Sequence, residues 1–232
     1  MKTFVNLALL WRKEEGILKH AIETLTKMID DAAYVCTHAW EATSMGQTVV
    51  SEKAKTLKGF DKAINQGERI VREIVVEHLT INPREDVAGC LALMNMAKDA
   101  ERVGDHGTNI LDIAIATQGN ACSSRFADRL AEGQRQVVPL FPMLHDAILD
   151  SDEQRAHEVL DRYQQAKAHI KQLQKDVLAT DFPAREAMYT LLLVVHLRRI
   201  NAHLANIASG IIFPIQNIDF ISRGLREERQ ET

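Results

Sequence analysis

Two acidic patterns, each spaced to occupy one face of a helix, are the part of this sequence that could do chemistry. The segment AKDAERVGDHGTN places Glu101 and Asp105 four residues apart. Upstream, Asp61, Asn65 and Glu68 form a second pattern with helical spacing. Residues three or four apart lie on the same side of a helix. Two such helices, antiparallel and side by side, would gather about four to six oxygen ligands.

The chemistry that these oxygen atoms favour is the binding of a hard cation. A buried carboxylate without a partner is strongly disfavoured, and one cation or several bridged cations would remove that cost. Oxygen-rich sites accept Fe, Mn, Mg, Zn and other ions, so we expect a divalent or trivalent metal whose identity the sequence leaves open. A simpler interpretation also stands, in which the acids are surface residues screened by Lys62, Lys98 and Arg102.

Further residues on the same helix are candidates for supporting roles, by orienting the acids or by packing: Arg102, His106, Asn109 and Asp112. A histidine at a helix interface is more often hydrogen-bonded into that interface than bound to a metal, and we expect this of His106. Asn109 is expected to satisfy backbone or cross-helix polar groups. Gly104 and Gly107 each weaken the helix by nearly 1 kcal/mol relative to Ala, which indicates close approach of another backbone or an ion.

The face that carries the acids is predicted to point toward the core and to turn acidic halfway along. Its apolar part consists of Val87, Cys90, Leu91 and Met94, and it continues into Glu101, Asp105 and Asp112. A second apolar line on the far side consists of Met96, Val103, Ile110 and Ala114. The acids therefore do not occupy a simple solvated face.

The segment that holds Glu101 is written twice. VVHLRRINAHLAN repeats it 97 residues later and keeps the Arg, His and Asn positions, but Arg198 and Ala202 replace Glu101 and Asp105. On the preceding helix we match Tyr163 and Lys167 to Asp61 and Asn65, and a shift to Asp161 and Gln165 restores no pair of acids. Because an arginine repels a cation, metal is expected in the first copy only.

The elements that must position these residues are helices. Apolar periodicity and breakers divide the chain into six segments: 11–43, 48–80, 84–118, 122–150, 152–181 and 183–213. Short connections imply antiparallel neighbours, so we predict an all-α fold of six long helices in two three-helix repeats. The first repeat spans 1–119, the second and diverged repeat spans 120–218, and a polar, frayed tail spans 219–232. Pro139 and Pro142 are expected to kink or break the fourth segment.

Composition limits the partners and the compartment. The chain has 232 residues and a net charge of −4, without a Lys/Arg block, so a nucleic-acid partner is disfavoured. Three cysteines, Cys36, Cys90 and Cys122, lie at no ligand spacing and are expected to be reduced packing residues. We see neither a signal peptide nor an apolar run long enough to cross a bilayer, and therefore expect a soluble, cytoplasmic protein.

Familiar catalytic patterns do not explain the acids. We find no Ser-His-Asp order, no phosphate-cradling glycine loop and no His-Glu-x-x-His helix in the sequence. The Glu-x-x-His pattern of di-iron bundles is also absent around Glu101 and Asp105. A non-enzymatic role is therefore favoured, while a carboxylate-bridged metal enzyme in a helical bundle remains an alternative.

AERVGDHGTNI closely resembles the signature of PhoU proteins, and the FDKAIN helix and Pro-containing turn before it fit the same family. LRRINAHLANIA resembles the family's second copy of the motif. The resemblance implies an all-α fold of two three-helix repeats that binds metal clusters through Glu/Asp-x-x-x-Asp motifs on paired helices. Glu101 and Asp105 match one such motif, and Asp61 and Asn65 match its partner.

The resemblance also implies a function. PhoU-like proteins regulate phosphate uptake and phosphate-responsive signalling by docking to a phosphate transporter subunit, to a sensor histidine kinase, or to both, at the cytoplasmic face of the membrane. We expect this role here, and a homo-oligomer is compatible with it. The alternative within the same family is a soluble domain or companion of a sodium-phosphate cotransporter.

Overall fold

The computed structural model describes residues 16–44, 46–121, 125–222 and 224–225. Within these ranges the chain is helical and contains no β-strand, which confirms the all-α class. The helices in chain order are α2 (Ile17–Ala42), α3 (Gln47–Ile81), α4 (Val87–Ala116), α5 (Ala127–Val137), α6 (Leu140–Leu149), α7 (Glu153–Ala179), α8 (Ala184–Ile212) and the short 3₁₀ helix η1 (Ile215–Asn217).

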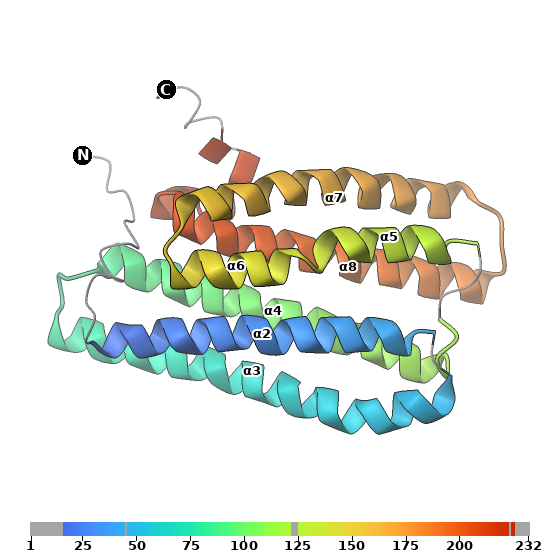
Figure 1. Cartoon of the computed structure of the whole chain (residues 1–232), viewed down its shortest axis with the longest axis horizontal. Helices are drawn as coiled ribbons and strands as arrows, with labels where there is room; N and C mark the ends of the chain where they lie inside the picture. The colour runs from blue at the N-terminus through green and yellow to red at the C-terminus, as the bar shows by residue number, and fades with distance from the viewer. Residues whose placement is uncertain (1–15, 45, 122–124, 223, 226–232) are drawn as a thin grey trace.

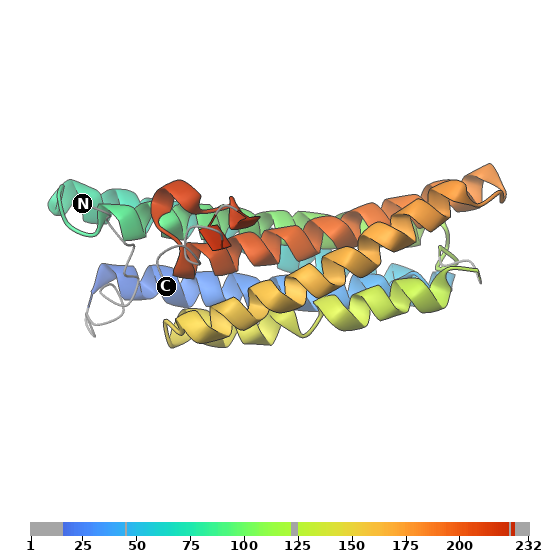
Figure 2. The same cartoon turned by 90° about the horizontal axis from the view of Figure 1, so that it is seen from above.

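The long helices run along the long axis of the molecule in two groups (Figure 1). One group consists of α2, α3 and α4, each in contact with the other two, and the other consists of α5, α6, α7 and α8. The groups meet where α4 packs on α8 and α2 packs on α6, so α3 and α7 lie on opposite outer sides. Seen from above, α7 runs obliquely across its own group (Figure 2).

The fourth predicted segment is interrupted at the expected place. Helix α5 ends at Val137, and Pro139 is the N-cap residue of α6. Pro139 supplies no N–H to continue the hydrogen-bond ladder, so the helix breaks there. Pro142 lies in the first turn of α6, where its missing N–H costs little because first-turn N–H groups have no helical partner.

The second apolar line of α4 forms the core, and the first one does so only in part. Met96, Val103, Ile110 and Ala114 are all buried, as predicted. In the first line Cys90 is buried, whereas Val87 and Leu91 are 41% and 44% exposed. The prediction that this line points into the core was therefore wrong for Val87 and Leu91.

The chain after α8 is more ordered than a frayed tail. Ile218 and Ile221 are buried. The backbone N–H of Asp219 donates to Ser209 Oγ of α8 at 3.1 Å. Within the predicted polar tail from residue 219, Ile221 is therefore a buried apolar exception and Phe220 is exposed, while residues 223 and 226–232 lie outside the described part. The division into two related repeats stays a prediction.

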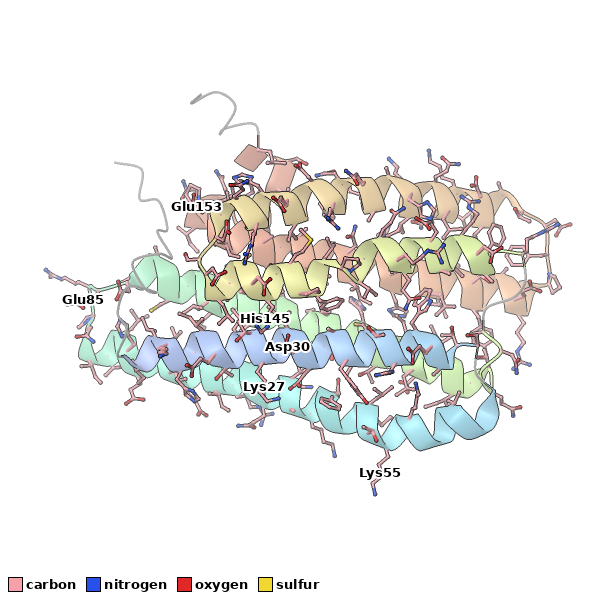
Figure 3. All side chains as sticks on the ribbon, viewed as in Figure 1. Lys27, Asp30, Lys55, Glu85, His145 and Glu153 are labelled. Atoms are coloured by element: carbon pink, nitrogen blue, oxygen red, sulfur yellow. The ribbon has the colours of Figure 1, made fainter. Side chains whose placement is uncertain are left out.

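Side-chain contacts also join the two groups. Asp30 of α2 and His145 of α6 point toward one another in Figure 3, and Asp30 Oδ1 lies 2.9 Å from His145 Nδ1. Cys36 and Cys90 are buried in the core, as expected of packing residues. Cys122 lies outside the described residues.

Candidate metal site between α3 and α4

The five oxygen-bearing side chains come from two helices that pack on each other. Asp61, Asn65 and Glu68 project from α3, while Glu101 and Asp105 project from α4. All five residues are partly buried. The side chains of Glu68 and Glu101 are each only 13% exposed. The two acidic patterns therefore belong to one region, which supports the juxtaposition predicted from their spacing.

Glu101 lies at the electrostatic centre of this region. Burial raises the pKa of its carboxyl group above the usual value, and the negative charges of Asp105, Glu68 and Asp61 raise it further. The neighbouring guanidinium of Arg102 lowers that pKa but does not cancel the rise. A carboxyl group held in this way favours either a proton or a cation.

Two arginines neutralise part of the negative charge. Arg102 Nη1 donates to Asp105 Oδ2 at 3.1 Å, and Arg102 Nε lies 3.5 Å from Glu101 Oε2. On α3, Arg72 forms an ion pair with Glu68 one helical turn away. The role suggested for Arg102 as a neighbour of the acids therefore has a direct geometric basis.

The remaining polar contacts connect α3 to α4 and to itself. Thr108 of α4 donates through Oγ1 to Asp61 Oδ1 at 3.0 Å, so Asp61 is held toward α4. Asn65 donates through Nδ2 to the backbone carbonyl of Asp61 at 3.0 Å. Thr108 was not among the residues expected here, and its spacing from Asp105 on α4 is the only sequence signal that could have indicated it.

The donor chemistry fits a hard cation, but the side chains are not closed around one. Among the described residues, no three His, Cys, Asp or Glu side chains stand close enough together to hold a metal as they are. The acids instead contact Arg72, Arg102 and Thr108. Metal binding here would require the two arginines to leave the carboxylates, which their exposed positions on the helices permit.

The two glycines beside Asp105 mark close helix packing. A Cβ atom added to Gly104 would lie 2.9 Å from Ile64 Cδ1 of α3. At Gly107 it would lie 2.8 Å from Val35 Cγ1 and 3.3 Å from the backbone nitrogen of Cys36, both on α2. The close approach predicted from these glycines is confirmed, and what approaches Gly107 includes the backbone of α2.

Two of the suggested supporting residues are exposed and make no contact with the acids among the described residues. Asp112 is exposed, and its Oδ1 lies 3.9 Å from Lys58 Nζ. Asn109 is also exposed, and its side chain makes no hydrogen bond within the described ranges. The expectation that Asn109 satisfies a cross-helix polar group was wrong, because that side of α4 faces solvent at this position.

His106 faces α8 and belongs to a polar cluster in the α4–α8 interface. Its Nδ1 lies 3.2 Å from His196 Nδ1, and its ring stacks on His203 with centroids 5.5 Å apart. Burial, followed by His196, His203, Arg199 and Arg102, lowers the pKa of His106 from 6.5 to about 4. The interface role expected of this histidine is confirmed.

The cluster contains two residues that sequence reasoning missed. Asp99 Oδ1 lies 2.6 Å from His203 Nδ1 and 3.4 Å from Asn206 Nδ2, and His196 is the neighbour of His106. Positions 99 and 196 are separated by 97 residues, the same offset as His106 and His203. That shared offset is the signal that could have indicated both residues.

The comparisons with known proteins bear on this region directly. The family model of the PhoU domain matches residues 18–114. Residues 18–114 are thus similar to the PhoU domain. The domain includes α2, α3 and α4 almost completely, and all five candidate metal-binding side chains lie within it. The family resemblance carried by AERVGDHGTNI is therefore confirmed.

Two solved PhoU structures share the fold. PhoU from Pseudomonas aeruginosa has 20% sequence identity and a TM-score of 0.66, with 84% of this chain and 93% of that chain covered. The phosphate transport system regulatory protein PhoU from Streptococcus pneumoniae has 19% identity and a TM-score of 0.68, with 84% and 95% covered. The search of curated proteins gives no match. The PhoU fold thus extends into the half that the family model leaves unmatched.

One further observation concerns the membrane. In the part of the chain that the structure describes, every helix is too short or too polar to be a candidate membrane span.

Proposed function

We propose that this protein regulates phosphate uptake and phosphate-responsive signalling by binding to other proteins and not by catalysis. The observation that carries the proposal is the PhoU domain at residues 18–114 within a fold shared with a phosphate transport system regulatory protein. In this proposal the protein works at the cytoplasmic face of the membrane, and its partner is a phosphate transporter subunit or a sensor histidine kinase.

We also propose that the PhoU domain holds metal between α3 and α4. Glu101, Asp105, Asp61 and Glu68 would supply carboxylate oxygens, and Asn65 adjoins them as an amide oxygen donor. A bound hard cation would neutralise these charges and connect the two helices. Support comes from the packing of α3 on α4 and from the raised pKa of Glu101, which burial raises most and the charges of Asp105, Glu68 and Asp61 raise further. Without a cation, Arg72 pairs with Glu68 and Arg102 pairs with Asp105.

We propose that the docking surface lies at the turn between α3 and α4. Four large apolar side chains are exposed in the last turns of α3 and the first two turns of α4: Val76, Ile81, Val87 and Leu91. Exposed apolar groups gathered in this way are typical of protein interaction sites. The surface belongs to the same helix pair as the metal site, so a cation that fixes α3 against α4 would also fix this surface.

The test is genetic complementation in the native host. Deletion is expected to change phosphate uptake or the expression of phosphate-responsive genes, and wild type is expected to restore the response. The variant Ile81→Asp/Leu91→Asp should fold but fail to restore it, because it places charge on the docking surface. Leu149→Asp/Met188→Asp, at exposed apolar positions on α6 and α8, is the matched control and should restore the response. An unchanged response to low and high phosphate after deletion would contradict the proposal.

A further inference from the structure

A groove with a volume of about 620 Å³ lies between α7 and α8, on the opposite side of the molecule from the carboxylates. Lys167, Lys171 and Lys175 line it from α7, and Arg198 and Arg199 line it from α8. Among the described residues, no Asp or Glu lines this groove. Five cations therefore share one groove, and the described residues place no negative charge on its walls.

The positive charge of the groove is not compensated nearby. Within the described ranges, none of the five cations makes an ion pair shorter than 4.0 Å. The carboxyl group of Asp176 has a lowered pKa, chiefly because Arg129 and Gln172 donate hydrogen bonds to it and to a smaller extent because of the charge of Lys175. Asp176 Oδ2 is already paired with Arg129 Nη2 at 2.7 Å. Like charges held together in this way repel one another, and an anion in the groove would relieve that repulsion.

The cations form a row and not a single point. Lys167, Lys171 and Lys175 are spaced four residues apart, so they lie on one face of α7 over a length of about 12 Å. On the opposite wall, Arg198 Nη1 donates to Gln174 Oε1 at 3.2 Å, which holds its guanidinium group at the groove. An extended row of cations suits a ligand that carries several linked anionic groups more than it suits one small ion.

A buried polar group at the groove lacks a donor. Asn201 lines the groove and is 1% exposed. Its Nδ2 donates to the backbone carbonyl of Tyr163 at 3.2 Å, while its Oδ1 is a buried acceptor without a hydrogen bond to any described residue. Buried acceptors in folded proteins are normally satisfied, so Oδ1 calls for a donor such as a water molecule, whereas the cations are the groups that would contact an anion.

The groove in the second half of the chain corresponds in position to the acidic site in the first half. Arg198 and Ala202 occupy the positions of Glu101 and Asp105 at the offset of 97 residues. The contact of Asn201 with Tyr163 corresponds to the contact of Gly104 with Ile64. In this alignment Lys167 corresponds to Glu68. The alignment expected from the sequence matched Lys167 to Asn65, which lies three residues earlier. Two of the carboxylates, Glu68 and Glu101, thus have the cations Lys167 and Arg198 at their corresponding positions.

We propose that the α7–α8 groove binds a ligand with two or more linked phosphate groups. Phosphate oxygens accept several charge-assisted hydrogen bonds from lysine and arginine at once, and the arginine fork can bind two of them together. The ligand could be a free inorganic phosphate chain or the phosphate tail of a nucleotide. Tyr163 also lines the groove, but its ring is buried and lies under Lys167.

The test is isothermal titration calorimetry of the full chain with tripolyphosphate, ATP, orthophosphate and sulfate, at about 150 mM salt so that unspecific surface attraction is screened. Tripolyphosphate is expected to bind at least about tenfold more tightly than orthophosphate or sulfate. Tighter binding of ATP than of tripolyphosphate would identify the ligand as a nucleotide, and equal binding would identify it as a phosphate chain. Binding no tighter than that of sulfate would overturn the proposal.

Matched variants place the binding in the groove. Lys171→Gln/Arg198→Gln removes two positive charges from its opposite walls and is expected to weaken tripolyphosphate binding at least about tenfold. Lys55→Gln/Lys62→Gln removes the same charge from exposed positions on α3, of which Lys55 points away from the bundle in Figure 3. Equal weakening in the two variants would show that net charge alone attracts the ligand. Because these residues lie outside the metal site and the docking surface, failure here leaves the proposed regulatory role standing.

Discussion

His203 of α8 and Asp99 of α4 bind each other through Nδ1 and Oδ1 at 2.6 Å. The corresponding pair at the offset of 97 residues is His106 and His196, which meet through their Nδ1 atoms at 3.2 Å. Within one cluster of the α4–α8 interface, one matched pair therefore joins a histidine to a carboxylate, and the other joins a histidine to a histidine. Glu101 and Arg198 likewise stand at matched positions 97 residues apart and differ in charge.

Asp99 is expected to stabilise the interface. Replacing it with Ala leaves His203 and Asn206 without their shared acceptor in a largely buried place. Loss of such a partner should lower the free energy of unfolding by about 1–3 kcal/mol, measured by urea denaturation. Asp112→Ala, at an exposed position of the same helix, should change it little. Equal stability of the two variants would show that the Asp99–His203 contact contributes nothing.

His106 is expected to make the fold sensitive to acid. Its pKa is lowered to about 4, so the unfolded chain binds more protons than the folded protein between about pH 6.5 and 4. Stability from this group is therefore lost as the pH falls through that window. His106→Gln cannot take up the proton, and its unfolding free energy should fall less between neutral and acidic pH than that of wild type. His20→Gln, at an exposed position on α2, is the control that should retain the wild-type slope.

Gly107 should tolerate no side chain, whereas Gly59 should benefit from one. A Cβ atom at Gly107 would meet Val35, Cys36 Sγ and the backbone of α2, while one at Gly59 has nothing within 4 Å. Gly107→Ala is expected to destabilise the protein by about 1–3 kcal/mol through overpacking. Gly59→Ala should stabilise it by up to about 1 kcal/mol through helix propensity. Thermal denaturation of both variants measures these changes. A gain in stability for Gly107→Ala would show that α2 is not packed as described.

Glu101 should destabilise the metal-free protein. Because its pKa is raised in the fold, the folded protein binds more protons than the unfolded chain above the ordinary carboxyl pKa, and stability falls as the pH rises through that window. Glu101→Gln removes the charge, so in the presence of a chelator it should unfold at a higher temperature than wild type near neutral pH. Glu73→Gln, exposed on α3, is the control. A lower unfolding temperature for Glu101→Gln would mean that this carboxylate is stabilised without metal.

The helices could be predicted from sequence because their signals are local. Periodicity and proline placed all six segments, and Pro139 indicated the break between α5 and α6. The orientation of α4 was harder, because Val87 and Leu91 continue an apolar line that no other helix covers. Apolar periodicity shows that a helix has a core face, but neighbouring helices decide how far along the helix that face is buried.

The candidate site was predictable in part for a similar reason. The spacing of Glu101, Asp105 and Asp61 brought the acids to one helix pair. Their present partners, Arg102 and Thr108, depend on side-chain conformations and on the rotation of α3 against α4, which spacing does not encode. The α4–α8 cluster and the basic groove involve residues far apart in the chain, and only the offset of 97 residues connects their positions in the sequence.

The most direct test of a metal site in the PhoU domain is the metal content of the purified protein. Wild type, Glu101→Ala/Asp105→Ala and the control Asp128→Ala/Glu153→Ala, which removes two acids from exposed positions on α5 and α7, would be prepared identically and measured by elemental mass spectrometry. We expect bound metal in wild type and in the control, and its loss in the Glu101/Asp105 variant. Equal metal content in all three proteins would contradict a site between α3 and α4.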